Sequence, residues 1–253
     1  MAPLGGRYSM ESPRGARRLR ACLGVSVVAW GLWSAPVASQ PPTDLRAAHQ
    51  LALRSTVVVS SPIGEGAGWV TELDGVRVVI TNRHVVQQIH RVDVIYADGV
   101  EATGLVVHRS TTLDVAVVVP AQDVHVPPLP MAHRPLVRGE RVVLAGHPGG
   151  MRFITSEGVV AGAAHGLPET DRACGENANC TVIDAETHFG NSGGPVVDAH
   201  GNCVGMVWGG MTATSFTLAV HAEPMFRELS AVAERIHAYR QRLRGHARHP
   251  RTR

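Results

Sequence analysis

GWVTELDGVRVVI, residues 68–80, places two runs rich in β-branched and aromatic residues on either side of an Asp-Gly pair. Such residues are enriched in strands. Asp74 and Gly75 form one of the dipeptides favoured where a two-residue turn requires a positive φ at both positions. The stretch therefore predicts a tight β-hairpin.

The same pattern extends over the chain on both sides of this hairpin. Asp98-Gly99 lies between the apolar runs 92–96 and 100–107. Further short runs with strand character follow at 114–119, 141–144, 154–161, 181–183, 195–197, 203–208 and 216–220. Short strands separated by turn residues predict an antiparallel barrel or sandwich rather than alternating strands and helices.

Two segments divide this series of strands and end it. Four prolines within 124–135 deny backbone donors to a sheet and indicate a connection between two halves, about 55–126 and about 136–222. Residues 223–243 have helical periodicity, with one face formed by Met225, Leu229, Val232, Ile236 and Tyr239. We therefore expect two β-rich halves followed by one helix.

The first 39 residues have the features of a signal peptide. A positive segment carries Arg14, Arg17, Arg18 and Arg20, residues 21–33 are uncharged, and Val37-Ala38-Ser39 offers small residues for cleavage after Ser39. The alternative is a retained membrane anchor, but a spanning helix needs about 20 apolar residues. We expect a secreted or periplasmic protein without stable membrane association.

The charge of the remaining chain is nearly balanced, but its C-terminus is basic. Seven arginines lie within 231–253, where Glu234 is the only acid. Such a segment can bind an anionic surface or a nucleic acid. A solvated helix end followed by a frayed basic tail explains it as well, and we favour that interpretation, with no nucleic-acid partner.

Two of the four cysteines lie close together on either side of a polar loop. In an oxidising compartment, Cys174 and Cys180 are expected to form a disulfide. A zinc site with His165 or His188 is the alternative, but the spacing matches no common zinc pattern. We expect no metal, and Cys203 is expected to be a buried, unreactive thiol.

GNSGGP, residues 190–195, is the most specific pattern for chemistry. A serine nucleophile needs a tight turn that exposes it and backbone N–H groups that face the oxygen on which charge develops. Ser192 is the candidate nucleophile, and the N–H groups of Gly190 and Ser192 are the candidate oxyanion hole. A plain surface turn is the alternative interpretation of this stretch.

Two further residues complete a set with Ser192. His84 lies where an apolar strand ends, and Asp114 lies at the start of another. A histidine can take the proton of the serine when a carboxylate orients its ring. Asp93 and Asp98 are alternative carboxylates, but Asp98 belongs to a turn and Asp93 follows His84 closely on a strand.

Taken together, these segments resemble the trypsin-like, chymotrypsin-fold serine peptidases, and within them the bacterial Deg/HtrA proteases and the glutamyl endopeptidases. Four more stretches, 66–70, 144–150, 182–185 and 215–220, match the same pattern. The resemblance implies an all-β fold of two antiparallel six-stranded barrels over 40–230, with a C-terminal helix. It also implies that the catalytic triad lies in the cleft between the barrels.

The resemblance has further implications for specificity. Asn191 replaces the family's usual aspartate before the serine, so activation through a new N-terminus is not expected. By analogy, the specificity pocket is lined by Glu186, Thr187, His188, Val207, Trp208 and Gly209. Glu186 would attract a basic substrate side chain, whereas Val207 replaces the histidine with which glutamyl endopeptidases recognise acidic side chains.

The expected function is hydrolysis of protein or peptide substrates without a cofactor, through an acyl-enzyme intermediate. Two alternatives stay open at this point. One is a peptide-binding pseudoprotease that keeps the barrels but lacks turnover, and the other is an esterase that acts on small acyl substrates.

Overall fold

The computed structural model describes residues 44–132, 134–176, 178–211 and 214–247, with 242–247 described by backbone alone. The signal peptide predicted over 1–39, Cys22 and the end of the basic tail beyond 247 lie outside the described residues.

The first barrel contains the hairpin that residues 68–80 predict. Asp74 and Gly75 have φ values of 48° and 74°, which match a turn that requires positive φ at both positions. The sheet closes in the order β1-β2-β3-β6-β5-β4. Its strands are β1 Thr56–Ser61, β2 Gly64–Leu73, β3 Val76–Thr81, β4 Arg91–Tyr96, β5 Glu101–Arg109 and β6 Ala116–Pro120.

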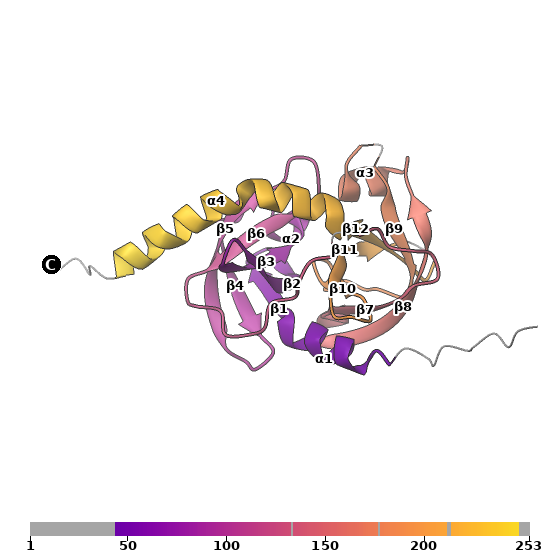
Figure 1. Ribbon diagram of the computed structural model, residues 1–253, viewed down its shortest axis with the longest axis horizontal. Coiled ribbons are helices and arrows are strands. Elements are labelled where there is room, and N and C mark those ends of the chain that lie inside the picture. Colours follow the sequence, from indigo (N-terminus) through magenta and orange to yellow (C-terminus); the bar gives the residue numbers. More distant parts are fainter. Residues whose placement is uncertain (1–43, 133, 177, 212–213, 248–253) are drawn as a thin grey trace, which may run out of the picture. The chain divides into compact units, whose positions relative to one another are not determined.

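The second barrel repeats this arrangement and closes in the order β10-β11-β12-β9-β8-β7. Its strands are β7 Arg141–Gly146, β8 Ile154–Ala164, β9 Cys180–Asp184, β10 Pro195–Val197, β11 Cys203–Gly210 and β12 Phe216–His221. Two closed six-stranded barrels (Figure 1) confirm the expected fold class and exclude the sandwich.

Helices occupy the ends of the described chain and three connections between strands. They are α1 Arg46–Ser55, α2 Arg83–Val86, the short 3₁₀ helix Pro148–Gly150, α3 Pro168–Cys174 and α4 Ala222–Ala247. The sequence pattern predicted α4 but neither α1 nor α3. The buried side of α1 is formed by Ala48, Ala52 and Ser55, and such small residues give little helical periodicity of large apolar side chains.

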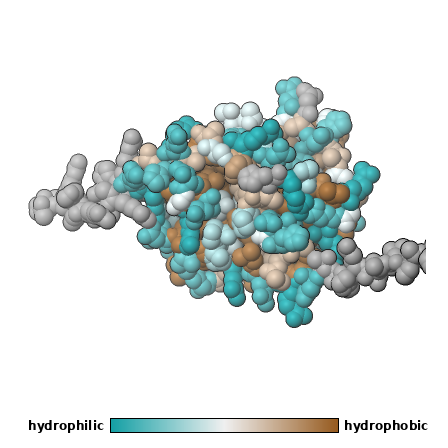
Figure 2. All heavy atoms as spheres, viewed as in Figure 1, coloured by the Kyte–Doolittle hydropathy of each residue, from teal (hydrophilic) through white to brown (hydrophobic). Residues whose placement is uncertain are grey.

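Helix α4 packs across the strands with the face that its periodicity predicts. Met225, Leu229, Val232 and Ile236 are buried in a core cluster that also contains residues of both barrels. Hydrophilic side chains cover much of the face seen in Figure 2, with small apolar areas between them. In the described part of the chain, no helix combines the length and apolar character that crossing a bilayer requires.

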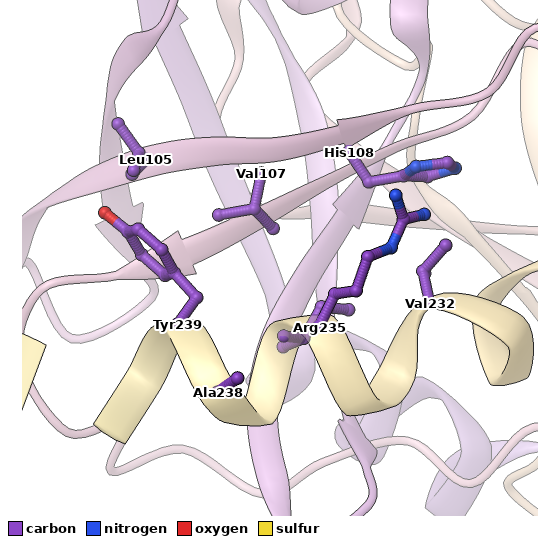
Figure 3. A pocket seen from close by; sticks show the side chains of 8 residues that line it. Leu105, Val107, His108, Val232, Arg235, Ala238 and Tyr239 are labelled. Atoms are coloured by element: carbon purple, nitrogen blue, oxygen red, sulfur yellow. The ribbon is translucent and has the colours of Figure 1, made fainter. Parts of the chain in front are cut away.

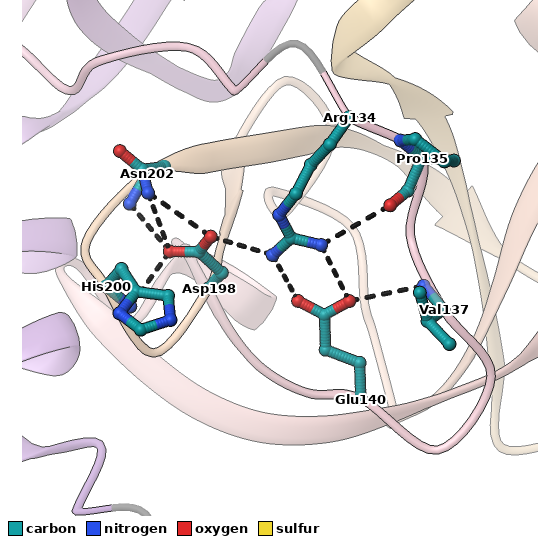
Figure 4. A network of polar contacts seen from close by, with 7 residues as sticks. All are labelled: Arg134, Pro135, Val137, Glu140, Asp198, His200 and Asn202. Atoms are coloured by element: carbon teal, nitrogen blue, oxygen red, sulfur yellow. Dashed lines mark hydrogen bonds and ion pairs between the residues drawn. The ribbon is translucent and has the colours of Figure 1, made fainter.

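A polar network fixes the segment between the barrels to the second barrel (Figure 4). Arg134 donates to both carboxylate oxygens of Glu140 and, at 2.8 Å, to Asp198, whose side chain is only 1% exposed. The hydrogen bond from Arg134 is the main reason that the pKa of Glu140 is lowered. Burial raises the pKa of Asp198, but hydrogen bonds from Asn202 and Arg134 outweigh this effect and lower it. Both carboxylates are therefore held in the charged form.

Candidate active site

Asp114 lies in the loop two residues before β6, whereas the sequence pattern predicts it at the start of that strand. Its side chain is buried, and its backbone is held on two sides. Asn82 donates its side-chain N–H to the Asp114 carbonyl at 2.9 Å, and the Asp114 N–H donates to the Ala173 carbonyl of α3 at 3.0 Å. The carboxylate therefore has little freedom to move.

His84 lies in α2 and contacts this carboxylate twice. Its backbone N–H donates to Oδ1 of Asp114 at 2.9 Å, and its ring Nδ1 lies 2.5 Å from Oδ2. An aspartate at Nδ1 places the ring proton there and leaves Nε2 as a lone-pair acceptor. Asp98 instead pairs with His125 at 2.6 Å, and Asp93 is part of β4, so Asp114 is the carboxylate that contacts His84.

Ser192 lies on the glycine-rich turn before β10. Its hydroxyl donates to the carbonyl oxygen of Trp208 at 2.9 Å. Among the described residues, no hydrogen bond joins Ser192 to His84. Ser192, His84 and Asp114 nevertheless line the same cavity, of about 750 Å³. The structure thus brings the three residues to one site, with the serine hydroxyl directed at a backbone carbonyl.

The turn before Ser192 requires glycine for two separate reasons. Gly190 has a φ of 101°, and the Asn191 N–H donates to the His188 carbonyl at 3.1 Å, as in a turn whose third residue has positive φ. A Cβ at Gly190 would also lie 2.1 Å from the His147 carbonyl oxygen. Within the described residues, the N–H groups of Gly190 and Ser192 donate to no protein acceptor, and an oxyanion hole requires donors that are unoccupied in this way.

His147 contacts this turn through its backbone and supports it, a role that the sequence did not reveal. Its backbone N–H donates to the Gly190 carbonyl at 3.2 Å. Its buried ring joins the two barrels, because Nε2 donates to the Val57 carbonyl at 3.0 Å while Nδ1 accepts the Phe153 N–H at 2.9 Å. Burial lowers the pKa of His147, so the neutral ring is favoured.

The residues expected in a specificity pocket divide into two groups. Thr187, His188, Trp208 and Gly209 line the cavity. Val207 does not, because its side chain is fully buried in the second barrel. Glu186 is also absent from the lining; it is exposed and lies 3.3 Å from His188.

Phe189 is a lining residue that the sequence interpretation omitted. Its side chain is 97% exposed although it is large and apolar.

The cysteines follow the predicted pairing. Cys174, the last residue of α3, is bonded to Cys180, the first residue of β9, which removes both sulfurs as zinc ligands. Cys203 is buried, and burial raises the pKa of its thiol to about 12. A thiol in this state is unreactive at neutral pH.

Comparisons with known proteins identify the family of the chain. The family described as the trypsin-like peptidase domain matches residues 66–206. The chain is 30% identical over 161 residues to Serine protease HtrA-like of Staphylococcus haemolyticus, covering 61% of this chain and 25% of that protein. It is 32% identical over 167 residues to Serine protease Rv3671c of Mycobacterium tuberculosis, covering 62% and 39%. The chain thus spans about a quarter to two fifths of the length of these relatives.

Solved structures show the same fold. A serine-to-alanine mutant of Rv3671c in its inactive form has a TM-score of 0.64 and 28% identity, covering 79% of this chain and 97% of that one. The HtrA-type protease AlgW with a tripeptide has a TM-score of 0.63 at 20% identity, which supports the fold alone. Because the family match covers more than half of the chain and the relatives are named serine proteases, the chain belongs to the trypsin-like peptidase family.

Proposed function

We propose that this protein is a serine endopeptidase in which Ser192 is the nucleophile, His84 the general base and Asp114 the residue that orients His84. The observation that carries the proposal is the His84–Asp114 pair, which is joined by two hydrogen bonds and lines the same cavity as Ser192. A buried carboxylate on Nδ1 gives the imidazole the tautomer that a general base requires.

The reaction begins with a rotation of the Ser192 hydroxyl from the Trp208 carbonyl to Nε2 of His84. Catalytic hydrogen bonds are often absent without substrate and form when it binds. His84 takes the proton as the serine oxygen attacks the peptide carbonyl, and the N–H groups of Gly190 and Ser192 stabilise the resulting oxyanion. His84 then protonates the leaving amine, and water hydrolyses the acyl-enzyme by the same steps.

The match to the trypsin-like peptidase family and to named serine proteases supports protein or peptide substrates rather than small acyl esters, and the proposed chemistry uses no cofactor. Trp208, Gly209, Thr187 and His188 are proposed to contact the substrate, with Phe189 at the cavity mouth. We propose that the protein acts outside the cytoplasm, in the periplasm or after secretion, because the predicted signal peptide and the Cys174–Cys180 disulfide both fit an oxidising compartment.

A binding protein without turnover is the second candidate function. One observation favours it: the Ser192 hydroxyl is engaged by Trp208 rather than by His84. The absence of protein acceptors for the Gly190 and Ser192 N–H groups among the described residues favours the enzyme, since peptide binding alone does not need an oxyanion site.

Casein cleavage tests the proposal against this alternative. We expect the wild-type protein to cleave casein and Ser192→Ala to lose all cleavage above background. Ser156→Ala is the matched control, because Ser156 is exposed on β8 and outside the cavity. Equal cleavage by the wild type and Ser192→Ala contradicts the proposed site, and peptide binding without cleavage by the wild type supports the second candidate.

A further inference from the structure

Helix α4 makes a polar contact with the loop that carries Asp114. Glu228 lies in the second turn of α4, and one of its carboxylate oxygens is 2.8 Å from Nε2 of His108. The other oxygen accepts the Ser110 hydroxyl at 2.7 Å and lies 3.4 Å from the Thr112 hydroxyl. Because α4 follows β12, this contact joins the end of the second barrel's chain to the Asp114 loop of the first barrel.

Ser110 transmits the contact into the loop. Its hydroxyl proton goes to Glu228, and its oxygen accepts the backbone N–H groups of Leu113 at 2.8 Å and Thr112 at 3.2 Å. A hydroxyl that donates to a carboxylate becomes a stronger acceptor, since hydrogen bonds in a chain polarise one another. The Ser110 N–H also donates to the Val115 carbonyl at 2.9 Å. The loop is thereby fixed on both sides of Asp114.

A second anchor on α4 holds the other end of β6. The buried guanidinium of Arg240 donates to the carbonyl oxygens of Pro120, Ala121 and Gln122 and pairs with Asp123 at 2.5 Å. The helix rises about 18 Å over the twelve residues from Glu228 to Arg240. Glu228 and Arg240 therefore contact the loops on opposite sides of β6.

Apolar contacts support α4 between the two anchors. Figure 3 shows Tyr239 rising from α4 towards Leu105, and Val232 rising below His108; Leu105 and His108 both lie on β5, the strand paired with β6. These side chains line a cavity of about 460 Å³, so packing in this region is incomplete. The polar anchors at the ends act together with Val232 and Ile236, which are buried between them, to fix α4 against the barrel.

We propose that Glu228 is a positioning residue that, through Ser110, holds Asp114 in the place where it orients His84. This inference rests on the proposed peptidase function. It assigns to the C-terminal helix a role in catalysis, although none of the helix side chains that the structure describes, residues 222–241, lines the cavity that contains Ser192.

Three variants of α4 test the proposal. Glu228→Ala removes the acceptor for Ser110, and we expect kcat to fall about tenfold or more with KM little changed, because a small misplacement of a catalytic group is costly. Glu228→Gln keeps an oxygen acceptor and is expected to retain kcat within about threefold. Glu234→Ala is the matched control, since Glu234 is exposed on the same helix, and it should leave kcat unchanged.

The low-field proton resonance of the His84–Asp114 hydrogen bond gives a readout that does not depend on cleavage. Glu228→Ala should broaden or lose this resonance, whereas Glu228→Gln and Glu234→Ala should keep it. A normal resonance and normal kcat in Glu228→Ala would overturn the proposal while the peptidase function stood. If the wild type cleaves nothing, the peptidase function fails and the resonance alone decides whether Glu228 positions Asp114.

Ser110→Ala serves if Glu228→Ala does not fold. It breaks the link to the loop but preserves the contact between Glu228 and His108, so α4 keeps one of its polar partners. We expect the same loss of kcat and of the low-field resonance. Wild-type values for both would overturn the proposal.

Discussion

The two barrels contribute to the candidate site in different ways. On the first barrel, His84 and Asp114 are fixed by side-chain hydrogen bonds: two join them to each other, and Asn82 holds the Asp114 backbone. On the second barrel, the Ser192 turn is built from glycine and backbone contacts, and the serine hydroxyl is engaged by the Trp208 carbonyl.

The two barrels therefore differ in whether their part of the candidate site must rearrange its hydrogen bonds before the proposed reaction. In the proposed mechanism, the base His84 already has its tautomer and its partner, whereas the nucleophile Ser192 must exchange one hydrogen bond for another before it can react. Side-chain rotation occurs within nanoseconds for exposed residues, so this exchange is compatible with turnover. It follows that substitutions on the first barrel should impair proton transfer, and substitutions on the second should impair oxyanion stabilisation.

Asp114→Asn should have the largest effect. An amide N–H facing Nδ1 of His84 forces the ring proton onto Nε2, which can then no longer accept the serine proton. We expect kcat to fall by about four orders of magnitude with the fold intact. Steady-state kinetics checks this, with Asp98→Asn as the control, since Asp98 pairs with His125 outside the site. A loss of less than about tenfold would show that His84 does not depend on Asp114.

Gly190→Ala should have the next largest effect, on the second barrel. The new Cβ would meet the His147 carbonyl at 2.1 Å in a backbone conformation with positive φ. The turn must then shift and withdraw an N–H from the oxyanion, which is expected to lower kcat by about 10²-fold to 10³-fold.

Gly99→Ala is the matched control for this substitution. Gly99 also has positive φ, but no atom lies within 4 Å of a Cβ there. It should lose stability without losing kcat. Equal loss of kcat in both variants would mean that backbone strain, not the oxyanion site, explains the result.

The smallest of these effects is a pH dependence that involves His147. Burial holds the pKa of His147 below the usual 6.5, so the unfolded chain binds this proton at a higher pH than the folded chain does. The folded state keeps this contribution to its stability in full above about pH 6.5. The free energy of unfolding then decreases as pH falls towards the lowered folded-state pKa of His147. Urea unfolding at several pH values should show less acid sensitivity in His147→Gln than in the wild type. The exposed control His165→Gln should behave as wild type, and identical slopes in all three proteins would contradict this role.

Local patterns predicted the strands and the site residues for a physical reason. The Asp74-Gly75 turn and the glycines around Ser192 meet backbone requirements that few other residues satisfy, so they are visible in the sequence. Val207 was expected to line the specificity pocket, but the alternation of side chains along β11 places it in the core of the second barrel. Neighbouring strand residues face opposite sides, so a pocket formed by the residues around Trp208 could not include both side chains.

Contacts between distant residues were not predictable in this way. Ser192 donates a hydrogen bond to a backbone carbonyl, and every residue has such a group, so no residue type in the sequence indicates this contact. Glu228 and Ser110 are hydrogen-bonded although they are 118 residues apart in the chain. Helix α3 is only seven residues long, which is too short to produce a recognisable helical periodicity in the sequence. These features arise from the tertiary fold.

Covalent labelling with a fluorophosphonate tests most directly whether Ser192 is a nucleophile activated by His84. The intact protein would be labelled, digested, and the modified residue located by mass spectrometry. We predict one labelled residue, Ser192, with labelling abolished in His84→Ala although the serine is still present. Labelling of another residue, or equal labelling in wild type and His84→Ala, would contradict the proposed mechanism.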